Sequence, residues 1–76
     1  MNYLEHKNYF FIGIGGIGMS ALAKYLHYNK KNISGYDKVQ TNLTKKLVSS
    51  GIGVSHNLKE SIIDLKKLNT KNTLVI

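Results

Sequence analysis

Apolar positions follow two different periods in the first third of this chain. The segment 8–14 (NYFFIGI) is rich in aromatic and β-branched residues and does not alternate, which is typical of a strand buried on both faces of a parallel sheet. Between Met19 and Leu26 apolar residues then recur at i, i+3, i+4 and i+7, the spacing of one helix face. We therefore predict a strand over 8–14 and a helix from about Met19 to Tyr28, ended by the polar segment NKKN.

The next part of the chain repeats the order of strand and helix. A short apolar run at 33–36 predicts a second strand, which ends directly before Asp37. Thr41 is suited to cap the helix that follows, and Gly51 is suited to end it. The predicted inward face of this helix consists of Leu43, Leu47 and Val48.

A third strand and helix complete the pattern. The segment 52–55 predicts a weak strand, Asn57 a helix cap, and Thr73 the start of a fourth strand. The inward face of the third helix is predicted to consist of Leu58, Ile62 and Leu65. The order β-α-β-α-β-α-β predicts a Rossmann-like α/β fold, a parallel sheet with flanking helices and right-handed crossovers. Because the pattern stops inside an apolar strand, we expect a truncated domain from a longer protein.

Composition narrows the class of protein. The 76 residues permit one small domain, and without cysteine it has neither disulfides nor cysteine metal ligands to support it. The net charge is +7, and all 11 basic residues are scattered lysines, which is typical of a solvated surface. Arginine, the preferred reader of bases, is absent, which argues against a nucleic-acid partner. No segment resembles a targeting signal or a membrane span, so we expect a cytoplasmic protein.

Histidines and tyrosines outside the glycine segment receive ordinary structural roles. His6, His27 and His56 do not share a metal-ligand spacing, so no metal site is predicted, and His6 and His27 are expected on the surface. Tyr9 and Tyr25 are expected to pack against the core.

Four glycines lie within six residues at the end of the first strand. Gly13, Gly15 and Gly18 form a G-x-G-x-x-G pattern between a strand and a helix, the context of a phosphate-binding turn. In such turns the first glycine makes the tight turn, the second lets the backbone approach a diphosphate, and the third allows close helix–strand packing. Gly16 adds a second position without a side chain. The helix that follows directs unpaired N–H groups and the positive end of its dipole at the anion.

Asp37 and His56 follow the second and third predicted strands. An acidic residue about twenty residues after the glycine turn usually bonds a ribose hydroxyl, and it would repel a 2′-phosphate, so NADP is disfavoured. Ligands bind at the carboxyl edge of parallel sheets, so His56 either contacts the ligand or flanks the next helix. Ser20 either donates to phosphate or occupies the first helical turn, and the second role is favoured. The group predicts a site for a nucleotide diphosphate.

The segment FIGIGGIGMSALAKYL, followed by SGYD, is more specific than the general fingerprint. It resembles the amino terminus of the Mur ligase family, the ATP-dependent ligases of peptidoglycan synthesis, whose members carry a G-I-G-G-x-G-M-S loop and then G-x-D at the second strand. Gly35 and Asp37 supply the second motif here, and His56 matches a histidine after the third strand. The resemblance implies a UDP-binding site made by Gly13, Gly15, Gly16, Ile17, Gly18, Met19, Ser20, Asp37 and His56.

The resemblance also implies a division of labour between domains. Residues 1–76 correspond to the first, Rossmann-like domain, whose partner is UDP-N-acetylmuramate, with the ATP-binding and carboxy-terminal domains absent. The full enzyme would use ATP and Mg²⁺ to form an acyl phosphate of the muramyl carboxylate, which the amine of L-alanine attacks. Such a reaction serves cell-wall synthesis and, through it, cell shape and division. This chain has no P-loop motif, and we assign it no catalytic residue, metal or cofactor, so we do not expect it to be active alone.

Three other interpretations remain open at this point. The general fingerprint equally permits the NAD-binding fragment of an oxidoreductase. A nucleotide-sensing module without catalysis would need the same loop. Within the Mur ligase family, the member that attaches a whole peptide has a related first domain, although the loop GIGGIGMSALA is more similar to that of the alanine-adding member.

Overall fold

The chain folds into alternating strands and helices. The computed structural model describes residues 6–68 and 72–76. Its elements are β1 (Asn8–Ile12), α1 (Ile17–Tyr28), β2 (Asn32–Tyr36), α2 (Asn42–Ser49), β3 (Gly53–Ser55), α3 (Leu58–Lys67) and β4 (Thr73–Val75). The strands form one four-stranded sheet in the order β3-β2-β1-β4, and every neighbouring pair is parallel. The predicted fold class and order of elements are confirmed.

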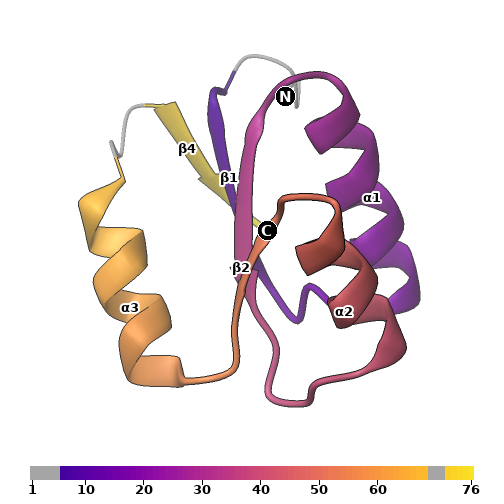
Figure 1. Cartoon of the computed structure of the whole chain (residues 1–76). Coiled ribbons are helices and arrows are strands. Elements are labelled where there is room, and N and C mark those ends of the chain that lie inside the picture. Colours follow the sequence, from indigo (N-terminus) through magenta and orange to yellow (C-terminus); the bar gives the residue numbers. More distant parts are fainter. Residues whose placement is uncertain (1–5, 69–71) are drawn as a thin grey trace.

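The helices lie on both faces of this sheet (Figure 1). α1 and α2 cover one face, and α3 covers the other. This arrangement follows from right-handed crossovers: the chain moves from β1 to β3 in one direction across the sheet, then returns from β3 to β4 over the opposite face. The direction reverses between β1 and β4, and ligands of open parallel sheets bind outside the carboxyl ends of strands at such a point.

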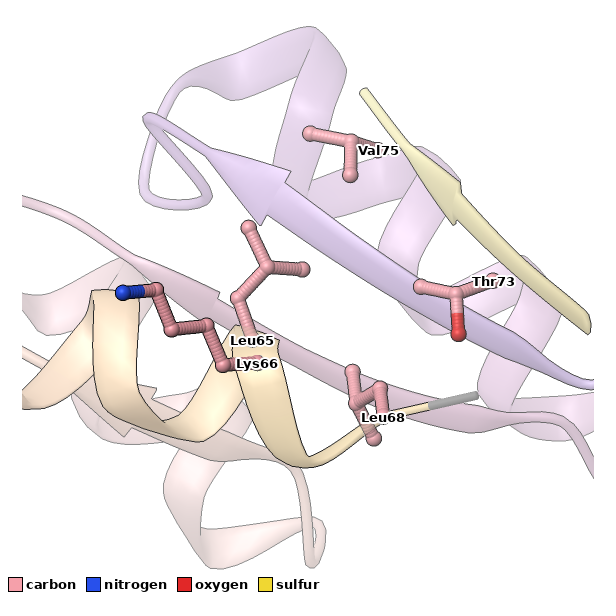
Figure 2. Close-up of a pocket in the computed structure, with 5 residues that line it drawn as sticks. All are labelled: Leu65, Lys66, Leu68, Thr73 and Val75. Carbon is pink, nitrogen blue, oxygen red and sulfur yellow. The ribbon is translucent and has the colours of Figure 1, made fainter. Parts of the chain in front are cut away.

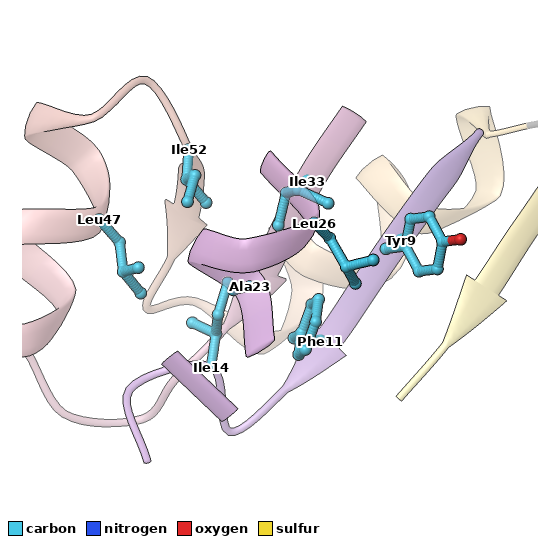
Figure 3. Packing of buried hydrophobic residues seen from close by; sticks show 8 residues of the cluster. All are labelled: Tyr9, Phe11, Ile14, Ala23, Leu26, Ile33, Leu47 and Ile52. Carbon is cyan, nitrogen blue, oxygen red and sulfur yellow. The ribbon is translucent and has the colours of Figure 1, made fainter. Parts of the chain in front are cut away.

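The main core fills the space between the sheet and the helices α1 and α2 (Figure 3). Its buried side chains are those of Tyr9, Phe11, Ile14, Ala23, Leu26, Ile33, Leu47 and Ile52. Phe10, between two members of this set, is also buried and lines a cavity below α3. β1 is therefore covered on both faces, which explains why its sequence does not alternate.

The predicted caps of α2 and α3 and the predicted end of α2 are confirmed. Thr41 caps α2 in a capping box, in which its side chain accepts from Thr44 N–H and the Thr44 hydroxyl accepts from Thr41 N–H. The Asn57 side chain caps α3 by accepting from Glu60 N–H at 3.1 Å. Gly51 follows α2 with a φ of +96°, a conformation that glycine adopts freely. None of the helices in the described part of the chain is long and apolar enough to cross a membrane.

Two boundaries differ by two residues from those predicted, and the starts of β2 and β3 differ by one residue. β1 ends at Ile12 instead of residue 14, because Gly13 adopts a φ of +81° and turns the chain out of the strand. α1 begins at Ile17 instead of near Met19, so two residues of the glycine segment belong to the helix itself.

Four predicted core residues are largely exposed. Leu58 and Ile62 are 57% and 45% exposed, because α3 turns Ser61 and half-buried Leu65 to the sheet instead. Ser61 donates to the Asn57 carbonyl at 2.9 Å, which satisfies its buried hydroxyl. Val48 (54% exposed) and Tyr25 (57% exposed) lie on the outer sides of α2 and α1.

Gly35 has no room for a side chain, because it packs closely against β1 and the loop after it. A Cβ at this position would lie 2.6 Å from the Phe11 carbonyl oxygen and 2.8 Å from Ile14 Cδ1. We expect Gly35→Ala to lower the free energy of unfolding by about 1–3 kcal/mol, the cost of overpacking a core. Urea denaturation followed by circular dichroism measures this change.

Gly53→Ala in the neighbouring strand is the matched control. Its Cβ would find only Ser34 Cβ at 3.8 Å, an ordinary contact, and alanine loses less entropy on folding than glycine. We expect no destabilisation. Equal unfolding midpoints for the two variants would contradict the packing described for Gly35.

Candidate functional site

Three loops meet at the carboxyl edge of the sheet. They are the glycine loop after β1, the Asp37 loop after β2 and the His56 loop after β3, which leave parallel neighbouring strands. The structure thus brings together the three regions in which the sequence predicted a nucleotide site. α1 begins at the same edge and points its amino terminus toward it (Figure 1).

The glycine loop is held on the sheet by its first residues. Gly13 N–H and Ile14 N–H both donate to the Tyr36 carbonyl, at 2.7 and 3.1 Å. The Ile14 side chain is completely buried in the core. Gly16 N–H donates back to the Gly13 carbonyl at 3.1 Å, which closes a tight turn. The positive φ of Gly13 confirms its predicted role as the turn residue.

Gly15 allows a carboxylate to approach the backbone. Its N–H donates to Asp37 Oδ2 at 2.8 Å. A Cβ on Gly15 would lie 2.8 Å from that oxygen and 2.7 Å from Thr44 Cγ2. The absence of a side chain at Gly15 is therefore explained by contacts within the protein, with Asp37 and α2.

Contacts within the protein do not explain why residues 16 and 18 are glycines, namely Gly16 and Gly18. Gly16 has a φ of −64°, which any residue adopts, and a Cβ there would meet nothing closer than 3.4 Å. A Cβ on Gly18 would meet nothing within 4 Å, so the prediction that Gly18 serves close helix–strand packing is wrong. Glycine inside a helix costs about 0.5–1 kcal/mol relative to alanine. The fold requires glycine at neither position.

The amino terminus of α1 offers unpaired main-chain donors. The first three helical N–H groups, those of Ile17, Gly18 and Met19, precede the first intrahelical bond, from Ser20 N–H to the Gly16 carbonyl at 2.7 Å. The N-cap is Gly16, no side chain caps the helix, and its first turn holds no acidic residue. Three free N–H groups at the positive end of a helix dipole form an anion-binding site.

Asp37 and His56 are joined to each other. His56 Nδ1 lies 2.7 Å from the Asp37 carbonyl oxygen. Because a carbonyl only accepts, Nδ1 carries the proton, and Nε2 is the nitrogen left for other contacts. The second carboxylate oxygen of Asp37, Oδ1, accepts from Val39 N–H at 3.0 Å. The arrangement fixes the orientation of the imidazole ring at the edge of the site.

A cavity of about 290 Å³, lined mostly by residues with polar side chains, lies beside His56. Its other lining residues are Gln40, Thr44, Lys45, Val48 and Ser49. Sequence reasoning did not select Gln40, Lys45 or Ser49; the only available signal was that Gln40 and Lys45 closely follow Asp37. A second cavity, of about 370 Å³, lies between α3 and β4 and is lined by three apolar side chains, Lys66 and Thr73 (Figure 2). The glycine loop does not line that cavity.

Other predicted residues take structural positions. Ser20 is buried, and its hydroxyl donates to the Ile17 carbonyl at 3.1 Å, in agreement with a place in the first helical turn. Met19 packs against the core with its side chain. His6 and His27 are partly exposed at the surface, and the His6 ring meets Tyr9 edge-on. Among the described residues, no three histidine, aspartate or glutamate side chains gather where they could hold a metal ion.

Comparison with known proteins places this geometry in a family. Residues 8–75 match the model described as "Mur ligase family, catalytic domain". The UDP-N-acetylmuramate–L-alanine ligase of Flavobacterium psychrophilum is 51% identical over 78 residues, and that of Flavobacterium johnsoniae is 50% identical over 78 residues. The ligase of the same name from Cytophaga hutchinsonii is 40% identical over 76 residues.

The matches cover all of this chain but only a small part of each relative. The match includes 100% of this chain in all three cases, but only 17%, 17% and 16% of the respective relatives. The chain therefore spans less than a fifth of the length of the curated relatives named here. No solved structure matches the chain.

The close contact of Gly15 with α2 generates a prediction. Gly15→Ala should lower the free energy of unfolding by about 1–3 kcal/mol, because the new methyl group overlaps Asp37 and Thr44. In a Thr44→Ser background, which removes Cγ2 and keeps the capping hydroxyl, the penalty should be smaller. Urea denaturation of the four proteins in this double-mutant cycle measures the coupling. Strictly additive penalties would contradict the contact.

Proposed function

Because this chain belongs to the Mur ligase family, we propose that it binds the UDP part of UDP-N-acetylmuramate. In this proposal residues 1–76 form the substrate-binding domain of a ligase that adds L-alanine to this nucleotide in peptidoglycan synthesis. The relatives cited above are named for that reaction. The alanine-adding member is favoured over the peptide-adding one for the same reason.

The observation that supports this proposal most directly is the uncapped start of α1. We infer that the N–H groups of Ile17, Gly18 and Met19 bind the diphosphate, whose charge the helix dipole favours. Gly16 and Gly18 leave the space that the phosphate oxygens need, which gives both glycines a purpose that the fold does not supply. Gly13 and Gly15 contribute by shaping the turn.

In this proposal the uridine lies next to the diphosphate, toward β3. The cavity beside His56 is lined by His56, Gln40 and Lys45, residues whose polar groups can meet the polar edge of uracil or the ribose hydroxyls. Asp37 lies between this cavity and the glycine loop. Ser20, with its hydroxyl bonded inside the helix, supports the loop rather than the ligand.

ATP and Mg²⁺ do not fit the residues of this chain. The sequence contains no G-x-x-x-x-G-K-[ST] motif, and the described residues offer no metal-binding cluster. We therefore infer that the ATP-dependent activation of the muramyl carboxylate takes place in other parts of the relatives' longer polypeptides. The role of this domain is to hold and orient the UDP-linked substrate.

A ligand comparison tests the proposal against the oxidoreductase alternative. Isothermal titration of the chain with UDP-N-acetylmuramate, UDP and NAD should give binding of both uridine nucleotides and weaker or no binding of NAD. None of the relatives named above is an oxidoreductase. Tighter binding of NAD than of UDP-N-acetylmuramate would overturn the proposed substrate.

Two substitutions at the start of α1 should separate stability from binding. Gly18→Ala should raise the free energy of unfolding by about 0.5–1 kcal/mol, because alanine favours the helix. Gly16→Ser places a hydroxyl at the N-cap, where it accepts from the N–H of Gly18 or Met19. Because the first variant fills the ligand space and the second occupies its donors, both should bind UDP about tenfold more weakly.

Urea denaturation and UDP titration of the same samples provide the two readouts. Gly53→Ala, in β3 and outside the loop, is the control that should keep wild-type affinity. If both loop variants bind UDP as tightly as the wild type, the diphosphate does not lie on these amides.

A further inference from the structure

Asp37 connects all three loops of the candidate site. Its carboxylate accepts from Gly15 N–H through Oδ2 and from Val39 N–H through Oδ1, at 2.8 and 3.0 Å. Its own N–H donates to the Ser55 carbonyl at 3.1 Å, and its carbonyl accepts from His56 Nδ1 at 2.7 Å. One residue thus holds the glycine loop, the β2–α2 loop and the β3–α3 loop together.

The bond to Gly15 controls the start of α1. Gly15 lies between Ile14, which is buried in the core, and Gly16, the N-cap of the helix. With Ile14 fixed on one side, the Asp37 carboxylate is the side-chain group that holds the next peptide unit of the loop. The direction of the free N–H groups beyond Gly16 therefore depends on this contact.

Both oxygens of Asp37 are turned to the protein's own backbone. An acidic residue in this position is ordinarily expected to accept from a ribose hydroxyl. Here each oxygen already accepts from a main-chain amide, and the Gly15 contact is so close that a Cβ would not fit. A carboxylate facing the ligand would also repel the diphosphate, whereas one bound to two amides is electrostatically compensated.

We propose that Asp37 is a positioning residue for nucleotide binding, which acts through Gly15 by holding the glycine loop in its binding geometry, and not through a bond to the ribose. This inference rests on the proposed UDP binding and specifies how one of its residues works. It predicts that loss of the carboxylate weakens binding of the diphosphate part of the ligand, regardless of which hydroxyl groups the ribose carries.

The test combines variants of Asp37 with changes in the ribose. Affinities of UDP, 2′-deoxy-UDP and 3′-deoxy-UDP are measured by calorimetry for the wild type, Asp37→Ala and Asp37→Asn, under conditions in which circular dichroism shows each protein folded. Asp37→Ala should weaken binding of all three nucleotides by the same factor, about tenfold. Asp37→Asn, which keeps one carbonyl acceptor, should show a smaller loss that is again equal for the three ligands.

Asp64→Ala is the matched control, since it removes the same side chain from an exposed position on α3. It should leave all three affinities unchanged. In the absence of ligand, the Gly15 amide should lose hydrogen-exchange protection in Asp37→Ala and keep it in Asp64→Ala.

Each contrary result has a separate meaning. A penalty that disappears for one deoxy ligand identifies a direct bond between Asp37 and that hydroxyl, and overturns the inference. So does unchanged UDP affinity in Asp37→Ala, or unchanged protection of the Gly15 amide. If the wild type binds none of the three nucleotides, the proposed function itself fails, and the inference fails with it.

Discussion

A helix that begins without a cap leaves its first N–H groups in need of an acceptor, and α1 begins in this way. Thr41 and Asn57 meet the same need at α2 and α3 with side-chain oxygens. At α1 the N-cap is a glycine and no side chain helps. Water can reach these exposed donors, but an anion also gains from the positive end of the helix dipole, so an external anion is the natural complement of this terminus. The site that we propose depends on this open helix start.

The same position shows a conflict between stability and function. Gly18 weakens the first turn of the helix and Gly16 leaves it without a side-chain cap, although neither a positive φ nor packing calls for glycine at these positions. Gly13, Gly15 and Gly35, in contrast, are required by a positive φ or by contacts shorter than 3 Å. A small domain has little stability to lose. Local choices that disfavour the fold are expected where a ligand must approach the backbone.

Local signals made much of the fold predictable from the sequence. The caps at Thr41 and Asn57 and the turn at Gly51 depend on neighbouring residues only, and all three were predicted. The meeting of three loops at one edge followed from the parallel direction of the strands, whereas the strand order β3-β2-β1-β4 was not predicted. Which face of α3 packs on the sheet could not be predicted in this way. The apolar residues Leu58 and Ile62 suggested one face, but the helix packs with the small side chain of Ser61 toward the sheet instead.

The candidate site was predictable in outline and not in its internal bonds. The sequence identified the glycine loop, Asp37 and His56, but not that the Asp37 carboxylate holds Gly15, since that contact depends on the spacing of two strands. The most direct test of the site is ¹H–¹⁵N correlation spectroscopy of the chain during titration with UDP-N-acetylmuramate. We expect the largest amide shifts at Ile17, Gly18 and Met19, with the capped start of α2 nearly unchanged. Saturation by the ligand with those three amides unmoved would contradict the assignment of the diphosphate to α1.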